Sequence, residues 1–178
     1  AEPFICVGSD GYSFSYDKQY TKTNPHPRSF ATFPQFFQTV REKQLMSIQD
    51  AVYKATALPA QILGLYDRGQ LKKGMAADIT IFDRERIASR STYLDSKVRP
   101  VGVPYVFVGG KLAYCDGRTV DFHSGKVLLH LNCWGYVIYN ASTGWITGSS
   151  SKASITKQRG NASLFCLPGR DLILQKVC

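Results

Sequence analysis

The sequence predicts an α/β protein, because three kinds of pattern follow one another along its 178 residues. An unbroken apolar run at residues 4–7 is typical of a strand buried on both faces, as in a parallel sheet. Segments in which apolar residues recur at helical spacing come next. From Gly69 onward, alternating residues and turn signals predict short strands.

The first predicted strand ends at a carboxylate, Asp10, which stands between Ser9 and Gly11. Parallel α/β folds keep their functional side chains at the C-terminal ends of strands, so this position favours a catalytic or metal-binding role. A glycine after the carboxylate would let the backbone turn sharply. Ser-Asp-Gly is also an ordinary turn sequence, and both interpretations stay open from these residues alone.

A long polar and aromatic loop, residues 12–25, leads from Asp10 to a corner made of Pro25, His26, Pro27 and Arg28. Long loops in compact domains are often functional. The two prolines stiffen the corner and limit where Arg28 can point. A guanidinium on such a loop suits an anionic group on a substrate, whereas the alternative is a surface arginine in a proline-rich loop.

Three helices are predicted after this corner. Thr32, with a glutamine three residues later, has the pattern of a capping box and predicts a helix over residues 33–43. Ser47, with an aspartate three residues later, predicts the start of a second helix. A third, short helix is expected over residues 60–63, with Gly64 as its C-cap.

The strands predicted after Gly69 are residues 77–83, 103–108 and 111–114. The last two form a hairpin across the dipeptide Gly109-Gly110, which suits a tight type I′ turn.

The net charge of +9 does not by itself indicate a nucleic-acid-binding protein, because the basic residues are scattered among acidic ones. No basic stripe alternates with stacking aromatics, so no nucleic-acid partner is expected. No apolar run is long enough to span a membrane. The five cysteines are odd in number and form no Cys-x-x-Cys pair, which argues against a disulfide framework or a zinc knuckle. The compartment stays open, with the cytoplasm favoured.

Several motifs together resemble the C-terminal part of the N-acyl-D-amino-acid deacylases, or D-aminoacylases, of the metal-dependent amidohydrolase superfamily. The resemblance begins at Val-Gly-Ser-Asp-Gly (7–11) and at the block 26–34, and covers about residues 4–130. It continues through residues 58–65, 67–69, 73–83 and 105–111. The Gly-Met-Ala-Ala-Asp stretch is shared widely across the superfamily, while His-Pro-Arg-Ser after Ser-Asp-Gly is much more specific to the D-aminoacylase branch.

The resemblance implies that the chain is the C-terminal fragment of a TIM-barrel enzyme. Residues 1–68 would be the last barrel strand with helices packed outside it, and residues 69–130 part of a small β-sandwich. Because the partner strands of that sandwich would lie upstream, the sheet is expected to expose unpaired edges. Residues 131–178 match no part of the family and are either a small β appendage or read-through past the normal end of the gene.

The resemblance also implies an activity: hydrolysis of N-acyl-D-amino acids, small-molecule substrates, at a zinc site. Asp10 would be the general acid/base at or beside the zinc and a possible metal ligand. Arg28, beyond the strand end, would bind the substrate α-carboxylate at the far side from the reacting amide, and His26 is a second candidate for lining the pocket. A catalytic zinc needs about three protein ligands, and the three histidines here are not at ligand spacing. The chain alone is therefore expected to be inactive, and poorly soluble or oligomeric.

Three alternatives stay beside this interpretation. The first is an amidohydrolase of cyclic amides such as hydantoins or dihydroorotate, against which the His-Pro-Arg block argues. The second is a non-catalytic basic binding module. The third is an inert partial domain.

Overall fold

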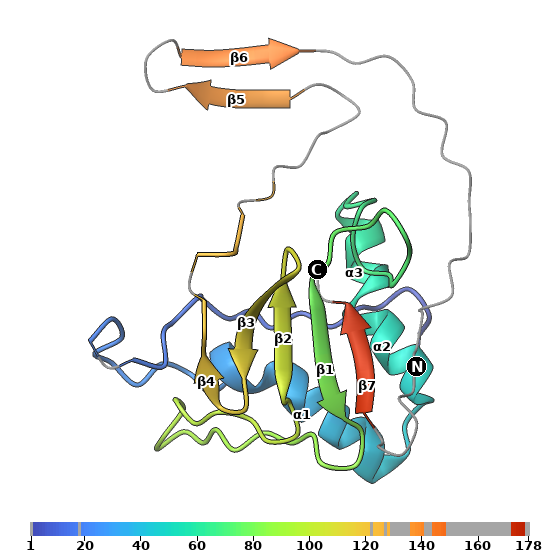
Figure 1. Ribbon diagram of the computed structural model, residues 1–178, viewed down its shortest axis with the longest axis vertical. Coiled ribbons are helices and arrows are strands. Elements are labelled where there is room, and N and C mark those ends of the chain that lie inside the picture. Colours follow the sequence, from blue (N-terminus) through green and yellow to red (C-terminus); the bar gives the residue numbers. More distant parts are fainter. Residues whose placement is uncertain are drawn as a thin grey trace.

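The computed structural model describes residues 2–17, 19–121, 123–126 and 128, and the strands at residues 136–140, 144–148 and 172–176. Three helices come first: α1 (Arg28–Lys43), α2 (Ile48–Ala55) and α3 (Ala57–Ile62). Figure 1 shows α1 and α2 behind one face of an open sheet. The predicted combination of helices and strands is confirmed, and the described sheet is antiparallel throughout.

The sheet has the strand order β4-β3-β2-β1-β7. Its members are β1 (Ile79–Asp83), β2 (Tyr105–Val108), β3 (Lys111–Cys115), β4 (Arg118–Thr119) and β7 (Leu172–Lys176). A separate hairpin joins β5 (Tyr136–Asn140) to β6 (Gly144–Gly148).

The predicted hairpin is confirmed. Gly109 and Gly110, between β2 and β3, have φ angles of 57° and 80°, and a type I′ turn needs positive φ at both central residues.

One predicted edge of the sheet is not free. Strand β7 pairs antiparallel along the whole of β1, from Ile79 opposite Lys176 to Asp83 opposite Leu172. The expectation of an unpaired edge is therefore wrong at β1, because a segment of the tail supplies the missing backbone hydrogen bonds. At the other end, β4 is only two residues long, which limits the edge that it presents.

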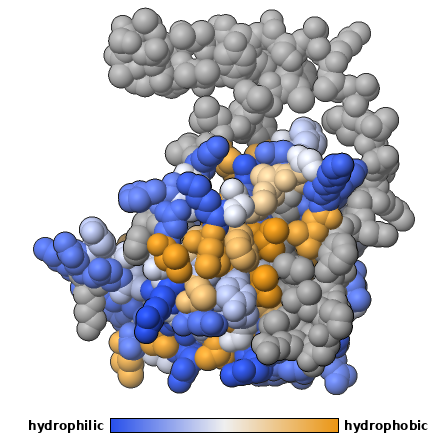
Figure 2. Space-filling view, viewed as in Figure 1, coloured by the Kyte–Doolittle hydropathy of each residue, from blue (hydrophilic) through white to orange (hydrophobic). Residues whose placement is uncertain are grey.

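The core lies between the helices and the sheet. The Phe37 ring of α1 lies 4.8 Å from the Phe82 ring of β1, centroid to centroid, and both side chains are almost fully buried. Ala51 and Val52 of α2 complete this layer. Because side chains alternate along a strand, Ile81 points to the opposite face of the sheet. Figure 2 shows apolar side chains gathered over that face.

The helix boundaries follow the predicted signals at α2 and differ from them at α1. Ser47 caps α2, since its Oγ accepts the Asp50 N–H at 3.1 Å, as the capping box requires. Helix α1 begins at Arg28 rather than at residue 33, and the predicted box at Thr32 is wrong. The Thr32 hydroxyl instead donates to the Arg28 carbonyl, 2.9 Å away, one turn back within the helix. Helix α3 begins earlier than expected, at Ala57, and Gly64 after it has the positive φ of a helix C-terminus.

The predicted strand at residues 4–7 does not form. In the described part of the chain this segment has no strand beside it, and a strand exists only where its backbone groups pair with a neighbour. It lies against α2 instead: the Val7 N–H donates to the Lys54 carbonyl at 3.1 Å. Lys54, a residue only 8% exposed, donates in return through its ammonium to the Ile5 carbonyl at 2.8 Å and to the Glu2 carbonyl. These contacts hold the chain against α2 as far as Val7, three residues before Asp10.

Candidate active site

Asp10 lies at a sharp change of direction in front of the first turn of α1. Its own φ is 48°, in the left-handed region, so the aspartate rather than the following glycine makes the turn. Gly11 is required for another reason. A Cβ atom at position 11 would lie 2.9 Å from the Ser29 Cα, so only glycine lets the chain approach the helix this closely.

Asp10 and Arg28 meet directly. Nη1 of Arg28 lies 2.8 Å from Oδ2 of Asp10, and the two side chains are 44% and 85% exposed. From the sequence, Asp10 and Arg28 are expected at opposite ends of a substrate, whereas the structure brings them into contact. An ion pair this exposed contributes at most about 1 kcal/mol, so a competing carboxylate can displace it. Since Asp10 occupies one Nη of a five-donor guanidinium, Arg28 also retains donors for a second anion.

His26 shapes the corner between the loop and the helix. Its Nδ1 accepts the Arg28 N–H at 3.1 Å, which satisfies a donor at the start of α1. Its ring meets the Tyr93 ring edge-on, with centroids 5.1 Å apart and an interplanar angle of 85°. Both contacts fix the imidazole beside the backbone of Arg28.

The loop of residues 12–25 packs on the same helix through its aromatic side chains. The Phe30 ring of α1 lies 4.8 Å from the Tyr16 ring and 6.4 Å from the Phe14 ring. The Arg99 guanidinium lies over the Tyr16 ring, 4.3 Å from the ring centroid. Burial raises the pKa of the Tyr16 phenol, an effect that the Arg99 charge partly opposes. The loop is thereby attached to both the helix and the segment before β2.

A family model described as the amidohydrolase family matches residues 10–114, from Asp10 into β3. The chain belongs to the amidohydrolase family. The match thus includes the Asp10–Arg28 pair, all three helices and the first part of the sheet.

Within the amidohydrolase family, the chain is similar to deacylases of N-acyl-D-amino acids, both in sequence and in structure. The N-acyl-D-aspartate deacylase of Alcaligenes xylosoxydans xylosoxydans is 34% identical over 129 residues, which is 72% of this chain and 24% of the deacylase. A solved N-acyl-D-glutamate deacylase from Bordetella bronchiseptica, complexed with zinc and a phosphonate inhibitor, is 35% identical with a TM-score of 0.56. The structural match covers 66% of this chain and 24% of the solved deacylase. The chain therefore spans about a quarter of the deacylases that it matches.

The described part of this amidohydrolase chain does not hold a zinc site by itself. No group of three or more histidine, cysteine, aspartate or glutamate side chains comes together among the described residues. A catalytic zinc takes about three protein ligands, so the side chains present do not fit the metal on their own. Asp10, 85% exposed, is available as one carboxylate ligand, while His26 faces Arg28 and Tyr93.

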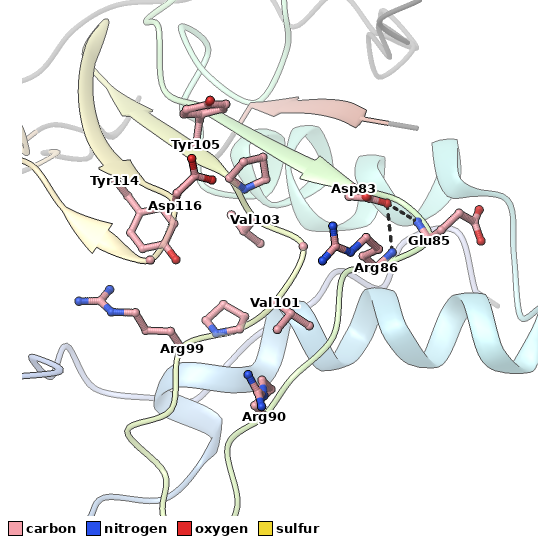
Figure 3. Close-up of a pocket in the computed structure, with 14 residues that line it drawn as sticks. Asp83, Glu85, Arg86, Arg90, Arg99, Val101, Val103, Tyr105, Tyr114 and Asp116 are labelled. Carbon is pink, nitrogen blue, oxygen red and sulfur yellow. Dashed lines mark hydrogen bonds between the residues drawn. The ribbon is translucent and has the colours of Figure 1, made fainter. Parts of the chain in front are cut away.

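A groove of about 940 Å³ lies elsewhere in this amidohydrolase segment, where β1 ends and β2 begins (Figure 3). Asp10, His26 and Arg28 do not line it. Its charges balance, because three arginines face three carboxylates: Arg86, Arg90, Arg99, Asp83, Glu85 and Asp116. The Asp83 carboxylate is moreover already hydrogen-bonded to the backbone. Its Oδ1 accepts the N–H groups of Glu85 and Arg86 (Figure 3). The groove offers no concentration of one charge to define a ligand.

The residues that hold the loop in place are not among those predicted from the sequence. Asn24, Tyr93 and Lys97 connect the loop to a turn about 70 residues later in the chain. An asparagine before Pro-His-Pro predicts a turn, but no local signal gives its partner.

The described residues also contain no helix long and apolar enough to cross a membrane.

Proposed function

We propose that this chain is the C-terminal part of a metal-dependent amidohydrolase that hydrolyses N-acyl-D-amino acids to a carboxylate and a free D-amino acid. The contact between Asp10 and Arg28 carries the proposal, since it joins a proton acceptor to a carboxylate receptor at one exposed site. The similarity to deacylases of N-acyl-D-aspartate and N-acyl-D-glutamate supports the substrate class. In the proposed domain organisation, residues 1–68 are the C-terminal end of a TIM barrel, residues 69–130 belong to a small β-sandwich, and residues 131–178 are a tail that is either an appendage or read-through.

Asp10 acts as the general acid and base. When a water attacks the amide carbonyl, Asp10 takes the water proton and then delivers it to the leaving nitrogen, so that the C–N bond breaks as a neutral amine departs. The exposed carboxylate can be reached by both the water and the substrate. The zinc of the proposed enzyme would need ligands from segments outside this chain, because the described residues do not supply a set of three.

Arg28 binds the α-carboxylate of the substrate. Its position at the first residue of α1 fixes its backbone, and the Asp10 contact draws its guanidinium toward the reacting group. A planar guanidinium holds a carboxylate through two parallel hydrogen bonds, which sets the orientation of the asymmetric carbon next to it. With the amide facing Asp10 and the carboxylate on Arg28, the two enantiomers place their side chains on opposite sides of the asymmetric carbon, so a third contact, with the side chain, selects the D form.

The test uses the full-length zinc-loaded protein that contains this chain. We expect turnover of N-acetyl-D-amino acids and little turnover of the L series. Asp10→Asn should lower kcat by roughly a thousandfold with unchanged metal content, because the amide is nearly isosteric but accepts no proton. Asp17→Asn, which removes another exposed carboxylate from the same loop, is the matched control and should leave kcat unchanged.

Three results would contradict the proposal. Preference for the L series would exclude the substrate class, and preference for a cyclic amide such as hydantoin would support the cyclic-amide alternative. An Asp10→Asn enzyme that retains about a tenth of its activity would remove Asp10 from the chemistry. A mobility-shift assay with mixed RNA and DNA at physiological salt tests the basic-module alternative, and we expect no binding.

A further inference from the structure

The turn at residues 92–97 is hydrogen-bonded to residues 21–24, in the loop that leads to the candidate site. We call this set of hydrogen bonds the clamp. The Asn24 side chain uses its full bonding capacity on this turn. Its Nδ2 donates to the carbonyls of Tyr93 and Leu94, at 3.0 and 3.2 Å. Its Oδ1 accepts from the backbone N and the hydroxyl of Ser96, at 3.0 and 2.7 Å, and Ser96 is completely buried.

A second side chain closes the clamp from the opposite direction. Lys97 Nζ donates to the carbonyls of Thr21 and Thr23, at 2.6 and 2.9 Å. The turn is also closed internally, because the Thr92 N–H donates to the Asp95 carbonyl at 2.9 Å. Six hydrogen bonds therefore join the loop and the turn, and a set of this size fixes the turn as a rigid neighbour of the corner at His26.

The clamp leaves one aromatic ring exposed beside the corner. Tyr93 is 77% exposed, and only its backbone carbonyl takes part in the clamp. Its ring lies edge-on against His26, whose Nδ1 binds the N–H of Arg28. Within the described residues the Tyr93 hydroxyl has no hydrogen-bonding partner. The fold thus needs the backbone at this position and makes little use of the side chain.

We infer that Tyr93 contacts the substrate and, with His26, forms the wall that receives the D-amino acid side chain. This inference rests on the proposed function. Contacts run in order from Asp10 through the Arg28 guanidinium and backbone to His26 and then Tyr93. With the amide at Asp10 and the carboxylate on Arg28, the substituent that extends toward Tyr93 is the side chain. An aromatic wall favours apolar and aromatic side chains over small ones.

The experiment compares N-acetyl-D-phenylalanine with N-acetyl-D-alanine in the full-length zinc-loaded enzyme. Tyr93→Ala should lower kcat/KM for the phenylalanine substrate about tenfold, mainly through KM, and leave the alanine substrate nearly unchanged. Tyr93→Phe should retain the preference, since it keeps the ring. Leu94→Ala is the matched control, because Leu94 is 95% exposed on the same turn and joins the clamp only through its backbone carbonyl.

An equal loss for both substrates in Tyr93→Ala would overturn the inference while leaving the proposed function intact. The same shift in Leu94→Ala would also overturn it, since any apolar loss on the turn would then suffice. An unaltered enzyme that hydrolyses neither D-substrate would refute the proposed function itself, and this inference with it.

Discussion

Replacing Asp78 by asparagine should loosen the hairpin between β2 and β3, because Asp78 holds that hairpin through a buried ion pair. Its Oδ2 pairs with Nη1 of Arg68, and its Oδ1 accepts the Gly109 N–H at 2.7 Å. The Arg68 and Asp78 side chains are only 14% and 13% exposed. Arg68 also contacts a second carboxylate, that of Asp67, whose Oδ1 lies 3.4 Å from Nε of Arg68 and whose side chain is 62% exposed.

The expected magnitude follows from these contacts. Removing one partner of a buried ion pair costs about 3–5 kcal/mol, because the other charge is left without compensation. Asparagine keeps an acceptor for Gly109 and Asp67 still offsets part of the Arg68 charge, so we expect about 2–4 kcal/mol. Asp67→Asn removes the exposed partner of the same arginine and should cost less than about 1 kcal/mol.

Hydrogen exchange of the hairpin amides is the suitable assay, because it reports local opening whatever the rest of the protein does. Asp78→Asn should accelerate exchange across β2 and β3 by roughly 30- to 1,000-fold, and Asp67→Asn by less than about fivefold. Equal acceleration in the two variants would mean that the net charge around Arg68 matters rather than the buried pair. Unchanged exchange in Asp78→Asn would show that the hairpin does not depend on this contact.

Three further changes have definite expected outcomes. Gly102→Ala should lower the free energy of unfolding by several kcal/mol in a denaturant titration, because the new Cβ would lie 2.5 Å from the Ile87 nitrogen at a φ of +75°. Gly74→Ala is the control: its φ is +88° but its Cβ would lie in open space, so it should cost only about 1–2 kcal/mol. Burial raises the pKa of Tyr16, so its contribution to stability is complete below about pH 10 and is lost as the pH rises further. Tyr16→Phe should remove this alkaline loss of stability, measured by denaturant titration at increasing pH. Arg28→Lys should raise KM roughly ten- to hundredfold for an N-acyl-D-amino acid and far less for the matching α-carboxamide.

The elements that could be predicted from the sequence are those whose signals are local. Ser47 and Asp50 lie three residues apart, and the hydrogen bond that they predict does form. Gly109 and Gly110 are adjacent, and their two positive φ angles decide the hairpin by themselves. The strand predicted at residues 4–7 failed because pairing depends on a neighbour that an apolar run does not specify.

The same distinction applies to the candidate site. The residue types and their spacing in the block His26–Arg28 indicate a functional site, and the structure does bring Arg28 into contact with Asp10. The clamp that surrounds the site was not predicted, since Asn24 and its partner Ser96 are 72 residues apart. Distant polar pairs leave no periodicity, and a buried serine looks like any other serine in a sequence.

The earlier start of α1 changes how Arg28 works. A loop arginine would have to be held by its neighbours, at a cost in conformational entropy each time that a substrate binds. As the first residue of a 16-residue helix, Arg28 has a backbone that is already ordered by α1, and Pro27 before it has φ −52°, close to the helical value. Only its side-chain rotamers remain to be ordered, and the Asp10 contact restricts those. The backbone of Arg28 is therefore ordered by the helix that Pro27 precedes, so a Gly11 substitution that clashes with Ser29 should displace Asp10 while leaving the Arg28 backbone in place.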